Sequence, residues 1–154
     1  MTGILAHPLL SFSAFAVLCL TAAATDIARR RIPNWVVAGL LATAVVHQLL
    51  GGWPPGLAAT GLFAGATVVL CGLYAAGLVG AGDVKMILAC LLYVGTAAMA
   101  PFLLNTALFG GFLAFGYLGV GRLRGSGRQQ SLPYGVAIAG AAILAAAAEL
   151  PGSV

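Results

Sequence analysis

Charge is the scarcest property of this sequence. Only 6% of its 154 residues are charged, and the acidic ones are Asp26, Asp83 and Glu149. Soluble domains carry about 25% charged residues, so a soluble domain with a polar surface is excluded. The chain is 62% hydrophobic. This composition predicts one integral membrane domain over residues 1–154, with no separate soluble module.

Cysteine is scarce as well. Cys19, Cys71 and Cys90 lie inside apolar segments and form no CxxC motif, so we expect small buried side chains and no disulfide framework or zinc site. A signal peptide carries positive charge before its apolar core, but here no Lys or Arg precedes the first apolar run. We therefore expect residues 1–25 to be retained. The sequence predicts no cofactor, no metal and no nucleic-acid partner, and it leaves the oligomeric state open.

Six apolar segments predict an all-α, polytopic membrane helix bundle of about six transmembrane helices. A spanning helix needs about 20 apolar residues, with roughly 17–25 tolerated. The segments are Pro8–Thr25, Trp35–Leu50, Leu57–Val79, Val84–Ala100, Phe102–Val120 and Leu132–Leu150. Pro101 is expected to break the helix between the fourth and fifth segments. Six glycines are expected to let helices pack closely: Gly61, Gly65, Gly72, Gly110, Gly111 and Gly116.

The basic residues alternate between the breaks that separate these segments. All seven fall in the first, third or fifth break: Arg29, Arg30, Arg31, Lys85, Arg122, Arg124 and Arg128. Loops rich in Lys and Arg stay on the cytoplasmic side of a membrane. We therefore expect both the N-terminus and the C-terminus on the non-cytoplasmic side. The same topology brings Asp26 and Asp83 to one membrane face.

Asp83 ends the motif Gly80-Ala81-Gly82-Asp83, which is expected just before a helix. Glycine permits unusual backbone conformations and the close approach of another chain. The unpaired N–H groups at a helix start favour a carboxylate, and a substrate strand can bond to the same groups. The motif is short, so its position at the edge of a membrane helix carries most of its weight.

Asp26 begins a second motif, which ends in Ile32-Pro33-Asn34. Pro33 suits the start of a helix, and Asn34 can hydrogen-bond in the turn. Arg29 is the arginine nearest to Asp26 in sequence and can hold that carboxylate ionised. A role as charges that orient the chain in the membrane is sufficient to explain the arginines and is favoured over a direct role with the substrate.

Two carboxylates in a partly dry site predict acid–base chemistry, because both cannot ionise easily. One keeps a proton while the other acts as a base, and together they activate a water and protonate the departing amine of a peptide bond. The alternative is that Asp26 and Asp83 are helix caps at a membrane boundary. A charged carboxylate costs roughly 2.5–3.5 kcal/mol at the bilayer centre, so two of them with flanking motifs favour catalysis.

Three motifs together resemble those of the type IV prepilin peptidases, polytopic aspartic proteases of the G-x-G-D type. They are Asp26 with Ile32-Pro33-Asn34, Gly80-Ala81-Gly82-Asp83-Val84-Lys85, and Leu132-Pro133-Tyr134-Gly135. The resemblance runs from about residue 15 to residue 145, and the short length is most similar to the Flp/Tad-pilus branch. It implies Asp26 and Asp83 as the catalytic pair. The supporting or substrate-binding positions are Gly80, Gly82, Lys85, Arg29, Pro33, Asn34, Pro133, Tyr134 and Gly135.

By this resemblance, the protein is expected to be a multi-pass endopeptidase of a bacterial-type inner (plasma) membrane, surrounded by lipid. Its substrate would be a type IV prepilin or pseudopilin, whose short basic leader is removed at the cytoplasmic face. Longer members of the family carry paired CxxC motifs in a cytoplasmic insertion and also N-methylate the product. This chain has neither the motifs nor the insertion, so N-methyltransferase activity is not predicted.

Two other functions compete with this interpretation. In a small ion- or proton-coupled transporter the two aspartates would bind ions, although such sites usually lie near the midplane between repeated halves. In a non-catalytic scaffold of a pilus or secretion assembly, asparagine would be tolerated at both positions. Loss of cleavage in the Asp→Asn variants distinguishes the peptidase from both.

Overall fold

The computed structural model describes residues 2–51, 56–124 and 132–150, and within these ranges the regular structure is entirely helical. Their helices are α1 (Thr2–Arg29), α2 (Asn34–Leu50), α3 (Leu57–Ala75), α4 (Ala81–Val94), α5 (Met99–Arg124) and α6 (Tyr134–Ala148). The predicted all-α class and the six helices are confirmed. Part of the fifth predicted break, including Arg128, lies outside the described residues.

Several helix boundaries differ from the sequence prediction, and three of these differences concern the motifs or Pro101. Helix α1 continues through Asp26 to Arg29, because charge ends an apolar run without interrupting helical hydrogen bonding. Ala81 already belongs to α4, so the Gly80–Asp83 motif forms the first helical turn and does not precede it. The prediction that Pro101 breaks a helix is wrong, since Pro101 lies in the first turn of α5, where its missing N–H has no partner to lose.

The helices fall into two length classes. Three contain stretches long and apolar enough to cross a membrane: Pro8–Arg29, Leu57–Ala75 and Met99–Gly116. Helices α2, α4 and α6 have 17, 14 and 15 residues, which at about 1.5 Å per residue is shorter than a hydrocarbon core of roughly 30 Å. The short helices occupy the interior of the bundle more than the long ones do, and they carry the two later sequence motifs.

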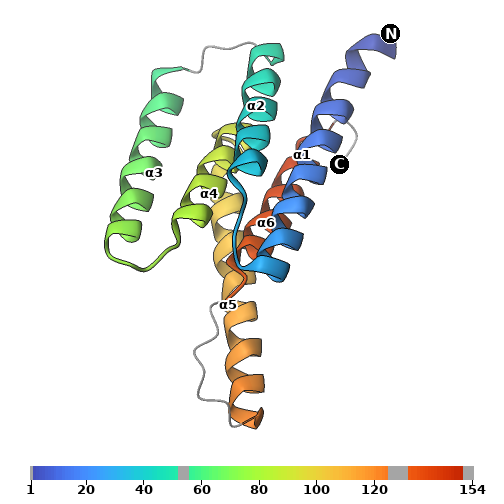
Figure 1. Ribbon diagram of the computed structural model, residues 1–154. Helices are drawn as coiled ribbons and strands as arrows, with labels where there is room; N and C mark the ends of the chain where they lie inside the picture. The colour runs from blue at the N-terminus through green and yellow to red at the C-terminus, as the bar shows by residue number, and fades with distance from the viewer. Residues whose placement is uncertain (1, 52–55, 125–131, 151–154) are drawn as a thin grey trace.

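Helices α4 and α6 form the centre of the bundle (Figure 1). Helix α4 packs against α2, α3, α5 and α6, and α6 packs against α1, α4 and α5. The chain alternates in direction, so the start of α1 and the end of α6 lie at the same end of the molecule. This agrees with an even number of crossings. The end of α1 and the starts of α2, α4 and α6 lie near one another on the side away from the N-terminus, and α5 extends beyond them.

The core combines a few large side chains with many small ones. Phe15, Phe102, Leu40, Met86 and Ile138 are fully buried. Helix α6 contributes mainly alanine to the core, which lets its neighbours approach closely: Ala137, Ala139, Ala141, Ala142, Ala145 and Ala146.

Two sequence predictions about small residues are corrected by this packing. Cys19 and Cys90 are buried as expected, but Cys71 is exposed on α3. Of the six glycines assigned to helix packing, only Gly110 has a neighbour within 4 Å of the position that a Cβ would occupy. The other five face open space in the described structure, because sequence spacing does not reveal whether a helix face meets protein or lipid.

Candidate active site

Asp26 is joined to α6 by a hydrogen bond across 109 positions of sequence. The backbone N–H of Gly135 donates to Oδ2 of Asp26 at 2.8 Å, and the Asp26 side chain is buried. Gly135 lies in the first turn of α6, where backbone N–H groups have no partner within the helix. A Cβ at Gly135 would lie 2.9 Å from Oδ2, so this approach requires glycine.

Asp83 occupies the first turn of α4, just before the apolar segment that begins at Val84. Its carboxylate accepts a hydrogen bond from the backbone N–H of Gly80, the residue that caps the helix. Burial raises the pKa of Asp83 from 3.8 to about 6; the charge of Asp26 adds to this rise, while the Gly80 N–H opposes it. The structure therefore brings the two predicted carboxylates close enough for their charges to interact.

The loop between α1 and α2 lies against the start of α4. Ile32 is the neighbour of Gly82, 3.6 Å from the position that a Cβ there would take. Pro33 is the N-cap of α2, one position earlier than expected, and Asn34 is the first helical residue. The Asn34 Oδ1 accepts a hydrogen bond from Nζ of Lys85 at 3.4 Å. The Ile-Pro-Asn and G-x-G-D motifs are thus in direct contact.

The third motif, Leu132-Pro133-Tyr134-Gly135, lies at the start of α6 and borders the site on that side. Pro133 is the buried N-cap of this helix, and Tyr134 is its first residue. The Tyr134 ring lies against α5, where a Cβ at Gly110 would collide with it. Tyr134 is also near enough to Asp83 for that charge to act on its hydroxyl group. Sequence reasoning assigned Gly110 only to helix packing, yet it provides the space that the Tyr134 ring occupies.

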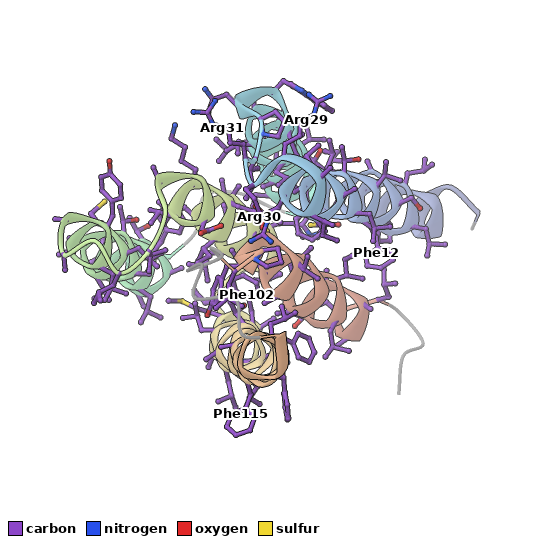
Figure 2. The ribbon with its side chains drawn as sticks, turned by 60° about the horizontal axis from the view of Figure 1, so that its bottom comes forward. Phe12, Arg29, Arg30, Arg31, Phe102 and Phe115 are labelled. Atoms are coloured by element: carbon purple, nitrogen blue, oxygen red, sulfur yellow. The ribbon has the colours of Figure 1, made fainter. Side chains whose placement is uncertain are left out.

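The three consecutive arginines differ in where they point (Figure 2). Arg29 and Arg31 lie at the edge of the molecule on the side of α2, whereas Arg30 lies in the middle of this end of the bundle. Among the described residues, Arg30 is the only non-glycine residue with a positive φ, 53°. The sequence analysis named Arg29 as a supporting residue and did not name Arg30. Three consecutive arginines do not indicate which of them adopts a left-handed backbone conformation.

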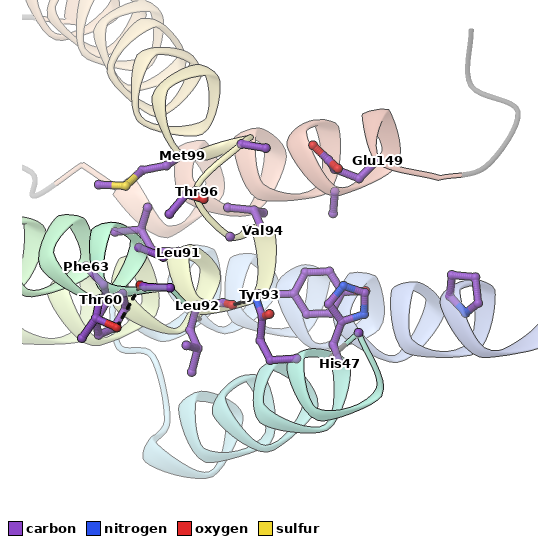
Figure 3. Close-up of a pocket in the computed structure, with 18 of the residues that line it drawn as sticks. His47, Thr60, Phe63, Leu91, Leu92, Tyr93, Val94, Thr96, Met99 and Glu149 are labelled. Atoms are coloured by element: carbon purple, nitrogen blue, oxygen red, sulfur yellow. Dashed lines mark hydrogen bonds between the residues drawn. The ribbon is translucent and has the colours of Figure 1, made fainter. Parts of the chain in front are cut away.

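A separate cavity lies at the other end of the molecule. It has a volume of about 740 Å³, and its polar lining includes His47, Tyr93 and Glu149, with His47 and Tyr93 side by side in Figure 3. The Ser11 hydroxyl is 3.0 Å from both His47 Nδ1 and the Tyr93 hydroxyl. These groups join the ends of α2 and α4 that are far from Asp83, so the cavity is separate from the carboxylate pair.

The chemistry available at the candidate site is that of two carboxylates. Within the described ranges, no three His, Cys, Asp or Glu residues come together as metal ligands. Asp26 and Asp83 each accept one backbone N–H, which leaves further carboxylate lone pairs for a water or a peptide group. One carboxylate that holds a proton beside one that does not is the arrangement needed for acid–base hydrolysis.

Comparison with known proteins agrees with the motifs. The model of the type IV leader peptidase family matches residues 13–115, which is two thirds of the chain and includes Asp26, Asp83 and their flanking motifs. The third motif, around Tyr134 and Gly135, lies beyond the matched range. No curated protein and no solved structure matches the chain.

Proposed function

Because the chain belongs to the type IV leader peptidase family, we propose that Asp26 and Asp83 are the catalytic pair of an aspartic endopeptidase. The observation that carries this proposal is the convergence of the two carboxylates: the charge of Asp26 adds to the rise that burial causes in the pKa of Asp83, although the two residues are 57 positions apart in sequence (83 − 26 = 57). The substrate would be a type IV prepilin or pseudopilin. Its short basic leader would be cut at the cytoplasmic face of a bacterial-type inner membrane.

The two carboxylates have different surroundings, and these support different roles in the proposed mechanism. The Gly135 N–H donates to Asp26, a contact that stabilises negative charge there, so Asp26 is the base that takes a proton from water. Asp83, with its raised pKa, keeps its proton longer and is the acid. As the water oxygen attacks the scissile carbonyl carbon, Asp83 protonates the carbonyl oxygen. The C–N bond then breaks and the nitrogen leaves with the proton held by Asp26, while one hydroxyl group of the tetrahedral carbon returns its proton to Asp83 as the carbonyl re-forms.

The helix-cap interpretation makes a different prediction. Each aspartate does accept an N–H at the start of a helix, Asp26 from Gly135 and Asp83 from Gly80. Asparagine has a side-chain oxygen that accepts the same bond, but it cannot exchange the proton. If capping were the only role, asparagine would preserve function at both positions. If the pair is catalytic, asparagine preserves the fold and removes cleavage.

The test is cleavage of a co-expressed prepilin-type substrate in membranes, followed by a gel shift. Asp26→Asn and Asp83→Asn are compared with wild type at matched protein levels, and Glu149→Gln is the control because Glu149 is the remaining acidic residue and borders the distant cavity. We expect each asparagine variant to lose at least about 100-fold in rate, with Glu149→Gln unchanged. Cleavage retained by either asparagine variant would contradict the catalytic pair.

A further inference from the structure

A second hollow lies on the outer side of α1, near its connection to α2. This groove has a volume of about 630 Å³. Its lining comes from the second half of α1, the following loop and the start of α2: Val17, Leu20, Thr21, Ala24, Thr25, Ala28, Arg29, Pro33 and Trp35. Asp26 is not among these residues and is bonded to α6 on another face of α1.

The groove is apolar in spite of its threonines. The Thr21 hydroxyl donates to the backbone oxygen of Val17 at 2.7 Å, and the Thr25 hydroxyl donates to that of Thr21 at 2.9 Å. Hydroxyl groups bonded back to their own helix leave their methyl groups to form the wall. The small side chains of Ala24 and Ala28 provide its depth.

The walls of the groove are exposed apolar side chains, of which Val17 and Leu20 lie on a segment that can span a membrane and Trp35 lies in the first turn of α2. Val17 is 61% exposed, Leu20 60% and Trp35 63%. Because the segment Pro8–Arg29 has the length and hydropathy of a membrane span, the Val17 and Leu20 side chains meet lipid and not water. Trp35 also has the side chain that commonly lies at the level of lipid headgroups.

The length of the groove fits one leaflet. Val17 and Arg29 are 12 residues apart (29 − 17 = 12), which is about 18 Å along a helix. Half of a hydrocarbon core of roughly 30 Å is about 15 Å. An acyl chain lying along α1 would therefore end near Val17 with its headgroup near Arg29.

The positive charge of Arg29, at the end of the groove near the loop to α2, favours a lipid with an anionic headgroup. Arg29 is the last residue of α1 and the only charged residue in the lining. Its guanidinium is suited to a phosphate, with which it can form two parallel hydrogen bonds. None of the lining residues is acidic, so nothing in the groove pairs with the amine of a zwitterionic headgroup. We propose that this groove binds an anionic phospholipid, with the phosphate on Arg29 and one acyl chain along the Val17–Ala28 face.

The experiment is native mass spectrometry of the full chain with added lipid. Palmitoyl-oleoyl phosphatidylglycerol is compared with palmitoyl-oleoyl phosphatidylcholine, which has the same acyl chains. We expect wild type to retain the anionic lipid about fivefold more tightly, in line with the usual contribution of one arginine near a charged lipid surface. Arg29→Gln should remove this preference. Arg31→Gln should keep it, because Arg31 carries the same charge but does not line the groove.

A second variant tests the acyl-chain position. Ala24→Leu fills the groove and should weaken the binding of both lipids severalfold, whereas it leaves the charge unchanged. Helix content by circular dichroism serves as the check on folding for every variant. The proposal is overturned if Arg29→Gln binds like wild type or if Arg31→Gln loses as much preference as Arg29→Gln. Displacement of the lipid by an equal concentration of glycerol 3-phosphate would also overturn it, because the site would then bind a bare anion.

Discussion

The Gly135 N–H donates to Oδ2 of Asp26 at 2.8 Å, and a Cβ at Gly135 would lie 2.9 Å from the same oxygen. The first turn of α6 therefore holds one carboxylate of the candidate pair, and it does so through a position that accepts no side chain. Because α6 also packs against α4, which carries Asp83, the same helix supports both carboxylates.

Gly135→Ala is expected to displace Asp26 and abolish cleavage. A displacement of about 1 Å at a catalytic group costs on the order of 100-fold in rate, and the broken hydrogen bond to a charged group costs about 1.5–3 kcal/mol of stability. The loss of rate is measured by substrate cleavage in membranes, and the loss of stability is measured by thermal unfolding in detergent.

Gly140→Ala is the matched control for this change, since Gly140 lies on the same helix. A Cβ at Gly140 would be 3.5 Å from the Phe109 ring, an ordinary contact. This variant should cleave normally and unfold at the same or a higher temperature, because alanine favours helix. Equal effects of the two substitutions would show that the contact with Asp26 has no special role.

The raised pKa of Asp83 predicts how cleavage depends on pH. If Asp83 donates a proton, the active form is the protonated one, which predominates below its pKa of about 6. The value of kcat/KM, which reports the free enzyme, should fall tenfold for each pH unit above about 6. For kcat the fall should begin at a higher pH, because a bound substrate excludes water and raises the pKa further.

This profile is measured with purified enzyme and a prepilin-type peptide between pH 5 and pH 9, after a check that the protein stays folded throughout. A kcat/KM that increases from pH 6 to pH 8 would contradict the assignment, since it would make the ionised form of Asp83 the active one.

Sequence reasoning reached the convergence of the carboxylates through the distribution of arginine and lysine. Basic residues in alternate breaks placed Asp26 and Asp83 at one end of the bundle, and the interaction of their charges agrees with that placement. The six helices followed from the apolar segments for a different reason. In lipid, every backbone polar group must be hydrogen-bonded within its own segment, and a helix achieves this. Which side of the membrane the aspartates face stays a prediction.

The contacts that complete the site had no local signal. The Asp26–Gly135 bond joins residues 109 positions apart, and the space that Gly110 leaves for Tyr134 depends on how α5 and α6 pack. Helix ends were misplaced for a related reason. Hydropathy marks where apolar residues stop, whereas the helix extends as far as its backbone hydrogen bonds do: α1 continues past Asp26 to Arg29, and α4 already begins at Ala81.

The backbone conformation of Arg30 is expected to lower the stability of the protein and to favour cleavage. A non-glycine residue in the left-handed region costs about 1–2 kcal/mol, and such strain is often found at functional sites. The φ of 53° turns Arg30 to the middle of the end that carries the candidate pair, as Figure 2 shows. Arg30→Gly should therefore lower cleavage severalfold while the unfolding temperature stays the same or rises.

Arg31→Gly provides the comparison for Arg30→Gly, because it removes the same charge from a residue without positive φ. It should lower the unfolding temperature slightly, since glycine gains entropy in the unfolded chain, and it should leave more cleavage than Arg30→Gly does. An unfolding temperature that falls equally in both variants, with equal cleavage, would refute a special role for Arg30.

The neighbouring glycines of α5 allow a test of Tyr134 without altering the tyrosine itself. A Cβ at Gly110 would collide with the Tyr134 ring, whereas one at Gly111 has nothing within 4 Å. Overpacking a tight contact typically costs about 1–3 kcal/mol, so Gly110→Ala should destabilise the protein and change the position of the Tyr134 ring relative to Asp83. Gly111→Ala should be neutral or stabilising, because alanine favours helix.

The pH profile of cleavage separates the effect of Gly110→Ala on stability from its effect on Asp83. If Tyr134 contributes to the surroundings of Asp83, Gly110→Ala should shift the descending limb of the kcat/KM profile, because the water around that carboxyl changes with the position of the ring. Tyr134→Phe keeps the ring and should shift the limb less. A Gly110→Ala enzyme that is less stable but keeps the wild-type pH profile would limit Tyr134 to packing against α5.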